Sequence, residues 1–264
     1  MNPSDKQIIR KIGYLKDQDG IINRFFRESE AWEAHLQKSR EFILTSFKDP
    51  SFKTLAVLGS GWLLDLPIEE LSERFEKILL LDIHHPRQVR HRIESFKNVF
   101  LQETDLSGGG VRFCYQLRKQ LRKQLRKKHM KSDPQLSLSD FKPAAPDLLF
   151  EPDAYISLNI LSQLHYFLLE YLEEDKYFQQ SETERFRTVI QQFHMDWISR
   201  KPACLITDIR ETNTDRTGKE SSKPLLSIKL PQGKRMDHWI WQFDAAKTYR
   251  PGMSTEMEVH ALEW

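Results

Sequence analysis

Five short apolar segments, each ending at glycine or a polar residue, constrain the fold of this 264-residue chain most strongly. Segments with helical spacing separate them, and this alternation is typical of strands that are buried on both faces of a parallel sheet. The segments are residues 54–58, 78–81, 98–101, 154–158 and 203–207. Ligands of such sheets bind beyond the carboxyl ends of the strands. We therefore expect an α/β protein whose binding site lies where these segments end.

The two ends of the chain follow other patterns. Across residues 1–50, apolar side chains recur at helical spacing, which predicts an N-terminal helical extension packed on the core. Residues 238–243 and 257–262 alternate apolar and polar side chains, which predicts an antiparallel strand pair. Pro251 and Gly252 stand between the two and predict the turn that joins them. The sheet is then mostly parallel and seven-stranded.

The composition favours one domain with additions over two separate domains. Hydrophobic residues make up 39% of the chain and include 16 Phe, which is enough for a single packed core. We place this domain at residues 51–264, with an insertion at about 107–152. The polar stretch 211–223 is expected to be an exposed loop.

A glycine turn follows the first apolar segment directly. Gly59, Ser60 and Gly61 stand between a predicted strand and a predicted helix, where backbone amides can approach a ligand closely. Asp82 ends the next strand about 20 residues further on, at the point where a carboxylate can accept hydrogen bonds from two ribose hydroxyls. An ordinary tight turn and a helix-capping aspartate are the structural alternatives, and we favour a nucleotide-type cofactor site. Asp65 is expected to cap the following helix rather than to contact a ligand.

These motifs resemble the class I S-adenosylmethionine-dependent methyltransferases, which have a Rossmann-like fold. The resemblance covers roughly residues 50–264 and includes the closing strand pair. It implies S-adenosylmethionine as cofactor, S-adenosylhomocysteine as product and an enzyme whose methyl acceptor is unknown. The segments that carry it are residues 57–61, 80–83, 103–106 and 157–164.

The resemblance also implies roles for individual residues of the cofactor site. Gly59 and Gly61 pass the methionine moiety, Asp82 holds the ribose, and Asp105 holds the adenine amino group. His84 follows Asp82 at the adenosine rim, where a surface histidine beside the site is the plainer interpretation. The other implied cofactor contacts are Ser60, Ile83, Leu106 and Asn159.

Three residues are candidates for the catalytic role. By the resemblance, Asn159 and Gln163 face the methyl donor or acceptor. His165 is a candidate general base because the unperturbed pKa of histidine lies near neutral pH. All three are also compatible with a structural role in the first turn of a helix. We expect no metal site.

Two departures from the family pattern keep other functions open. No acidic residue precedes Gly59, where the family anchors the amino group of its cofactor. This departure is compatible with a non-catalytic Rossmann-like binding or scaffold protein, in which Trp62 fills the methionine position. No further glycine follows Gly61, which disfavours a dinucleotide because pyrophosphate binding uses a third glycine. A nicotinamide-dependent oxidoreductase is therefore the weaker alternative.

The insertion carries a basic repeat. Gln-Leu-Arg-Lys occurs three times in residues 116–127, and the leucines form one stripe of a basic helix predicted over 112–131. Like charges four residues apart repel each other, and nucleic acid or another anionic partner would offset that repulsion. The alternative, which we favour, is a solvated amphipathic helix packed by its leucines. Residues 132–152 are expected to form an extended linker or lid.

The remaining features concern the setting of the protein. Cys114 and Cys204 are unpaired in sequence and are expected to be buried as small apolar residues. No apolar stretch approaches the roughly 20 residues of a membrane span, and the first residues lack a signal-peptide pattern. We expect a cytoplasmic protein.

Overall fold

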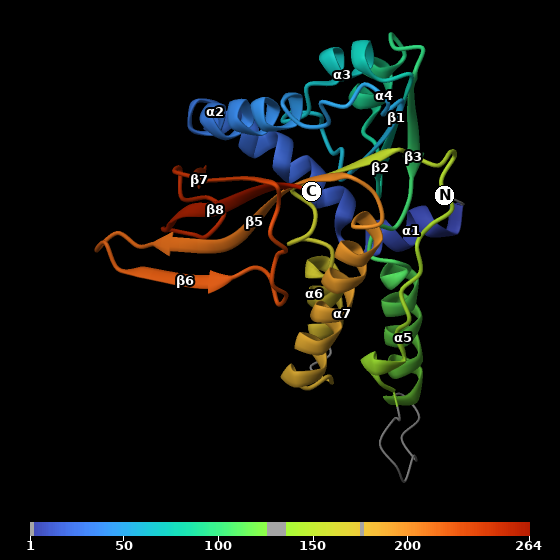
Figure 1. Cartoon of the computed structure of the whole chain (residues 1–264). Helices are drawn as coiled ribbons and strands as arrows, with labels where there is room; N and C mark the ends of the chain where they lie inside the picture. The colour runs from blue at the N-terminus through green and yellow to red at the C-terminus, as the bar shows by residue number, and fades with distance from the viewer. Residues whose placement is uncertain (1–2, 126–135, 175–176) are drawn as a thin grey trace.

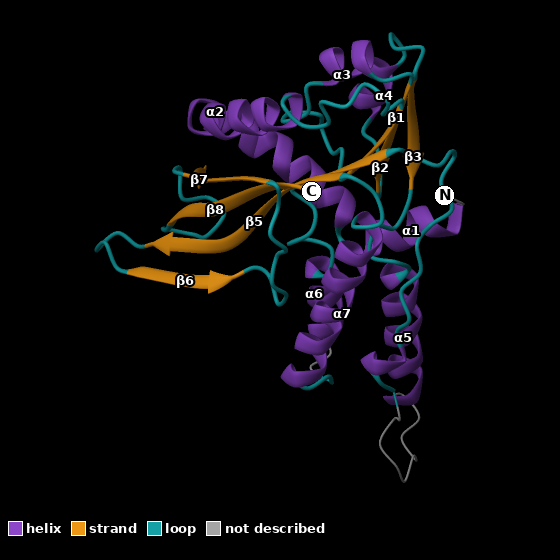
Figure 2. Cartoon of the chain, viewed as in Figure 1, coloured by secondary structure: helices purple, strands orange, loops and turns teal. Residues whose placement is uncertain are grey.

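A computed structural model describes residues 3–125, 136–174 and 177–264. One twisted sheet runs through the molecule, with helices on both faces (Figure 1; Figure 2). The strands follow the order β3-β2-β1-β4-β5-β8-β7, and an eighth strand, β6, pairs with β5 beside this path. The first five strands in the order are parallel, and β8 and β7 are antiparallel. The predicted Rossmann-like α/β sheet with a C-terminal antiparallel pair is confirmed.

The parallel strands lie where the apolar segments predicted them. They are β1 (Thr54–Leu58), β2 (Lys77–Asp82), β3 (Val99–Glu103), β4 (Ala154–Leu158) and β5 (Ala203–Thr214). Alternate residues of these strands enter two separate hydrophobic clusters: Leu55 and Val57 belong to one, and Ala56 and Leu58 to the other. Because helices cover both faces of the sheet over residues 55–58, 78–81 and 203–206, these segments are continuously apolar.

The helices divide between the two faces of the sheet. The cluster containing Val57 packs against α2 (Tyr14–Leu44), α3 (Ile68–Arg74) and α4 (Arg87–Ile93). The cluster containing Leu58 packs against α1 (Pro3–Ile12), α5 (Gly110–Leu125), α6 (Tyr166–Glu173) and α7 (Gln180–Ile198). None of the described helices is long and apolar enough to cross a membrane.

Helix α2 is docked onto the antiparallel part of the sheet, formed by β7 (Arg235–Asp244) and β8 (Ser254–Glu263). The indole N–H of Trp32 donates to the carbonyl of Phe243 at 2.9 Å. Glu28, where the helix is kinked, accepts the backbone N–H groups of Ala245 and Ala246 at 3.1 and 2.9 Å. These contacts fix the N-terminal helices to the core.

The prediction of an exposed loop at residues 211–223 is correct in exposure for 216–223 but wrong in structure, because only 215–219 form a turn and the flanking residues belong to strands. Strand β5 continues past an irregularity between Asp208 and Arg210, and its last residues pair with both β8 and β6 (Glu220–Pro224). The polar side chains at this end of β5 form hydrogen bonds with one another and with β8. Asn213 donates to Glu211 at 2.8 Å and accepts from Thr255 at 2.7 Å. Such a strand has no apolar alternation by which sequence could identify it.

Helix α5 follows the predicted stripe in part. Leu117 and Leu121 are buried, whereas Leu125 is 58% exposed. Arg118 is only 2% exposed: its guanidinium lies over the ring of Tyr171 and pairs with Glu174. The predicted basic helix continues to residue 131, but residues 126–131 lie outside the described part of the chain. Of the predicted linker or lid, residues 136–152 contain one short 3-10 helix, Leu138–Asp140.

Candidate functional site

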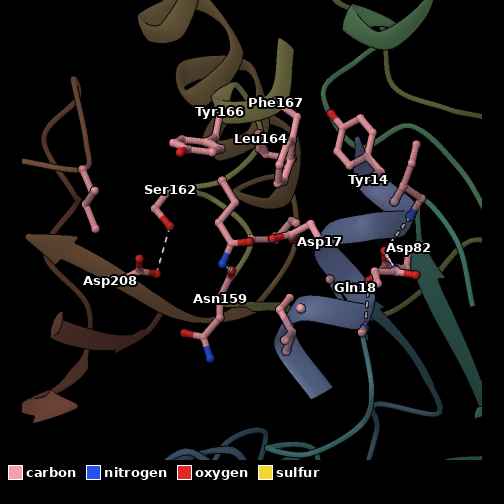
Figure 3. Close-up of a pocket in the computed structure, with 18 of the residues that line it drawn as sticks. Tyr14, Asp17, Gln18, Asp82, Asn159, Ser162, Leu164, Tyr166, Phe167 and Asp208 are labelled. Atoms are coloured by element: carbon pink, nitrogen blue, oxygen red, sulfur yellow. Dashed lines mark hydrogen bonds between the residues drawn. The ribbon is translucent and has the colours of Figure 1, made fainter. Parts of the chain in front are cut away.

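A cavity of about 920 Å³ opens at the carboxyl ends of the parallel strands (Figure 3). Each of the five parallel strands, or the loop that directly follows it, contributes residues to the wall of the cavity, as expected for this sheet. The strand-end residues that line it include Gly59, Ser60, Gly61, Asp82, Ile83, Asp105, Leu106, Asn159 and Asp208. The structure therefore brings together nearly all of the predicted cofactor residues.

The glycine turn is held tightly between two neighbouring strands. Gly59 donates its N–H to the carbonyl of Leu81 at 2.9 Å and has a φ of 82°. A Cβ at Gly59 would lie 2.7 Å from both the Cβ of Ile160 and the carbonyl oxygen of Leu158. Gly61, with a φ of 49°, donates its N–H to Oδ2 of Asp82 at 2.8 Å. Only glycine fits the first position, both for conformation and for space.

Asp82 is the centre of the hydrogen bonds around this turn. Besides the Gly61 N–H, it accepts the N–H of Ile83 at 2.7 Å and the side-chain amide of Gln18 at 3.4 Å. Burial raises the pKa of Asp82 to about 6, and the N–H donors oppose that shift. At neutral pH the carboxylate is therefore mostly ionised inside the cavity, because its pKa of about 6 lies only slightly below that pH.

The other predicted adenosine contacts are placed differently. Asp105 lines the cavity, yet its two oxygens accept the N–H groups of Ser107 and Val111 at 3.0 Å, so it also organises the start of α5. Burial raises the pKa of Asp105. His84 is not among the cavity-lining residues, because its ring turns to Glu103, with Nδ1 and Oε1 2.7 Å apart.

At the end of β4, Asn159 lies in the left-handed region with a φ of 48°. Its side-chain amide donates to Oδ2 of Asp65 at 2.7 Å, while its buried Oδ1 has no hydrogen-bond partner among the described residues. The side chain of Gln163 turns back to the carbonyl of Asn159 at 2.9 Å. The amide oxygen of Asn159 is thus an unsatisfied acceptor in the wall of the cavity.

The expectation that Asp65 caps a helix is wrong. Helix α3 begins at Ile68 with Pro67 as its N-cap residue and has no side-chain cap. Leu63, with a φ of 59°, turns the chain so that Asp65 lines the cavity instead. Burial raises the pKa of Asp65, and the hydrogen bond from Asn159 opposes that shift. The chain thus has an acidic side chain in the cavity even though none precedes Gly59.

His165 lines the cavity but is poorly suited to take a proton at neutral pH. Burial, together with the charge of Arg187, lowers its pKa to about 3. Its Nδ1 has no partner among the described residues. A general base works best when its pKa lies near the working pH, so this neutral ring is a weak base.

Sequence reasoning missed the residues that the N-terminal helices and β5 bring to the site. Tyr14, Asp17 and Gln18 come from the first turns of α2, directly after Gly13, where a φ of 113° separates α1 from α2. Burial raises the pKa of Asp17 to about 6. Asp208 comes from β5. The glycine at position 13 was the sequence feature that could have indicated a break before Tyr14, Asp17 and Gln18. The aspartate directly after the apolar segment 203–207 could have indicated Asp208.

Solved structures of similar fold exist, but their sequence identity to this chain is low. No family model matches the chain, and no curated protein matches it in sequence. Among solved structures, the DhpI–SAH complex is 10% identical with a TM-score of 0.36, covering 97% of this chain and 95% of that one. The N-methyltransferase NodS from Bradyrhizobium japonicum, in complex with S-adenosyl-L-homocysteine, is 10% identical with a TM-score of 0.39, covering 87% and 86%. At these values the function has to be argued from the site itself.

We predict that Gly59→Ala destabilises the fold far more than Gly218→Ala. Both glycines have a φ of 82°, but a Cβ at Gly218 meets nothing within 4 Å. Gly218→Ala then carries only the left-handed strain of about 1 kcal/mol, whereas Gly59→Ala adds overpacking and costs about 2–4 kcal/mol. Urea unfolding measures both values. Equal losses would show that Ile160 and Leu158 move aside without cost.

Proposed function

We propose that this chain is an S-adenosylmethionine-dependent methyltransferase whose acceptor is a separate molecule. The observation that carries the proposal is the convergence of three groups on one cavity. These are the glycine turn after β1, the Asp82 carboxylate at the end of β2 and the unsatisfied Asn159 amide after β4. A carboxylate at the second strand end is placed to accept ribose hydroxyls, and backbone at a glycine turn admits close approach.

The residues present fit the cofactor. Gln18 is the most distant donor to Asp82, at 3.4 Å, and its amide keeps a 2.8 Å bond to the carbonyl of His84. A ribose hydroxyl can therefore take the place of Gln18 on Asp82 without leaving that amide unpaired. The free Oδ1 of Asn159 and the carboxylate of Asp65 are acceptors for the amino group of the methionine moiety.

The cavity argues against the two alternative functions. A scaffold protein with an eroded site predicts that Trp62 fills the methionine position. Instead, the indole N–H of Trp62 donates to the backbone carbonyl of Gln18 at 2.8 Å, and about 920 Å³ remains open. This volume lies within the usual range for small-molecule sites, roughly 300–1,000 Å³. A dinucleotide is disfavoured because the turn ends at Gly61 without a third glycine.

The sulfonium of S-adenosylmethionine supplies an already activated methyl group. The task of the protein is then to align donor and acceptor and to exclude water. Helix α2 contributes to both, since Tyr14, Asp17 and Gln18 cover the cavity over the strand ends (Figure 3).

The proposed function predicts that the chain binds S-adenosylmethionine and S-adenosylhomocysteine and does not bind NAD. Asp82→Asn removes the charge that strengthens hydrogen bonds from ribose, so we expect affinity to fall by about 10- to 100-fold. Asp19→Asn is the control, because Asp19 is exposed on α2 and does not line the cavity. Isothermal titration calorimetry measures all three proteins. Failure of the wild type to bind either sulfur ligand contradicts the proposal.

A second prediction of the proposed function concerns pH. Because the folded pKa of Asp82 is about 6, above its ordinary value of 3.8, Asp82 is protonated below pH 6 and loses acceptor strength. Affinity for S-adenosylhomocysteine should fall by about tenfold per pH unit below 6. By the same linkage, ionising Asp82 destabilises the apo fold as pH rises from about 4 to 6. Titrations from pH 5 to 8 test this, and Asp82→Asn should flatten the dependence; a dependence that persists in that variant assigns it to another group.

For the basic helix we propose a nucleic-acid partner. Part of the charge on α5 is already used within the chain, because Arg112 pairs with Asp5 and Arg118 with Glu174. Lys119 and Lys123 are exposed and line a groove of about 700 Å³ beside Lys11. Arg118 and Arg122 also line the groove, where both pair with Glu174. A cationic groove of this kind supports contact with phosphates.

We therefore expect the double variant Lys119→Gln, Lys123→Gln to bind single-stranded RNA more weakly than the wild type. The slope of log affinity against log salt should fall by about one unit per lysine removed. Lys48→Gln, Lys97→Gln carries the same charge change at exposed positions outside the groove and is the control. Fluorescence anisotropy with labelled RNA measures both, and equal slopes in the two double variants exclude this helix as the contact.

A further inference from the structure

The cavity has a second half, past Asn159 and beside the end of β5, that the proposed cofactor residues do not occupy. In the sheet order, β1 and β4 lie between β2 and β5, so the end of β5 is three strands from Asp82, roughly 14 Å. Figure 3 shows Ser162 and Asp208 on one side of the cavity and Gln18 and Asp82 on the other. If adenosine binds at β1–β3, this second half receives the methyl acceptor.

Asp208 is the strand-end carboxylate with the fewest bonds to the protein. It is 5% exposed, and the hydroxyl of Ser162 donates to its Oδ1 at 2.9 Å. Asp82, by contrast, accepts from three N–H groups. Burial, with a smaller contribution from the charge of Glu211, raises the pKa of Asp208 to about 6, and the hydrogen bond from Ser162 opposes that shift. A carboxylate this buried is stable in ionised form only when donors complete its hydrogen bonds.

Three cations around this half of the cavity are engaged by other groups. Lys223 and Arg250 both pair with Glu211, at 3.2 and 3.3 Å. Arg24 lies over the rings of Phe243 and Tyr249, at 4.6 and 4.9 Å from their centroids. A fourth, Arg187, donates to the carbonyl of Pro224 at 3.0 Å, while its buried Nε has no partner among the described residues. Asp208 has no such cation among its described partners, so a ligand with an N–H donor complements it and an anionic ligand does not.

The position of Asp208 in β5 also indicates a functional role. The register of the β5–β8 ladder shifts between Asp208 and Arg210, and such irregularities re-aim side chains and recur beside active sites. Aromatic and other apolar side chains complete the wall of this half and would contact the body of a small ligand. They include Tyr166, Phe167, Trp241, Phe243, Tyr249 and Met257.

We propose that Asp208, oriented by Ser162, binds the N–H of the methyl acceptor and that the acceptor is a small arylalkylamine-type nitrogen compound. This inference rests on the proposed methyltransferase function for its chemical step. The bound ammonium group first gives one N–H proton to the Asp208 carboxylate, which passes it to water. The neutral nitrogen then forms a bond to the methyl carbon of S-adenosylmethionine, the S–CH₃ bond breaks, and sulfur keeps the electron pair. Asp208 is therefore a catalytic residue and Ser162 a positioning residue.

The test measures the binding of three amines to the protein: benzylamine, 2-phenylethylamine and tryptamine. The comparison ligand is 3-phenylpropionate, which has a similar aromatic body and the opposite charge. Each is added with and without saturating S-adenosylhomocysteine. The proteins are the wild type, Asp208→Asn, Ser162→Ala and the exposed control Asp19→Asn. We expect the wild type to bind at least one amine in preference to 3-phenylpropionate, and Asp208→Asn to lose at least tenfold in that affinity. Ser162→Ala should lose less, and Asp19→Asn should match the wild type.

Binding of S-adenosylhomocysteine by each variant checks that its fold and cofactor site are intact. If Asp208→Asn retains that binding and loses the amine, the inference stands. Equal binding of amine and 3-phenylpropionate, an unchanged amine affinity in Asp208→Asn, or no binding of any amine overturns it and leaves the cofactor proposal standing. If the wild type binds an amine through Asp208 but does not bind S-adenosylhomocysteine, the methyltransferase proposal fails instead.

Discussion

The burial of the Asp82 carboxylate is the constraint on which the rest of the site depends. An ionised carboxylate inside a protein is unfavourable unless hydrogen-bond donors surround it. Gly61 supplies one donor from the turn after β1, Ile83 supplies one from β2 and its loop, and Gln18 supplies one from α2. Three segments far apart in sequence therefore meet at one pair of oxygens, and the shape of the cavity follows from that meeting.

The N-terminal helices are consequently part of the site and not an accessory layer. The first turns of α2 reach Asp82 through Gln18, and further along the helix Glu28 and Trp32 bind the backbone that ends β7. A helix anchored to the sheet at both places has little freedom to withdraw from the cavity it covers.

The sequence predicts those features of the fold that depend on residues close together in the chain. The five parallel strands and the positions of Gly59 and Asp82 follow from continuous apolar segments and their ends, because both faces of the sheet are covered. Asp65 shows the limit of this reasoning: an aspartate two residues before a proline resembles a helix cap, and only the turn at Leu63 directs it to Asn159. Gln18 carries no local signal, since its role depends on where α2 is docked.

The basic repeat shows the same limit in another way. In sequence Arg118 and Arg122 occupy equivalent positions of the Gln-Leu-Arg-Lys unit. In the fold Arg118 is almost fully buried over Tyr171, whereas Arg122 is exposed, although it also pairs with Glu174 at 3.6 Å. A buried arginine costs free energy unless it is paired, and Glu174 and the aromatic ring compensate that cost. One arginine of the repeat is therefore structural, and the charge available to an outside partner comes from its neighbours.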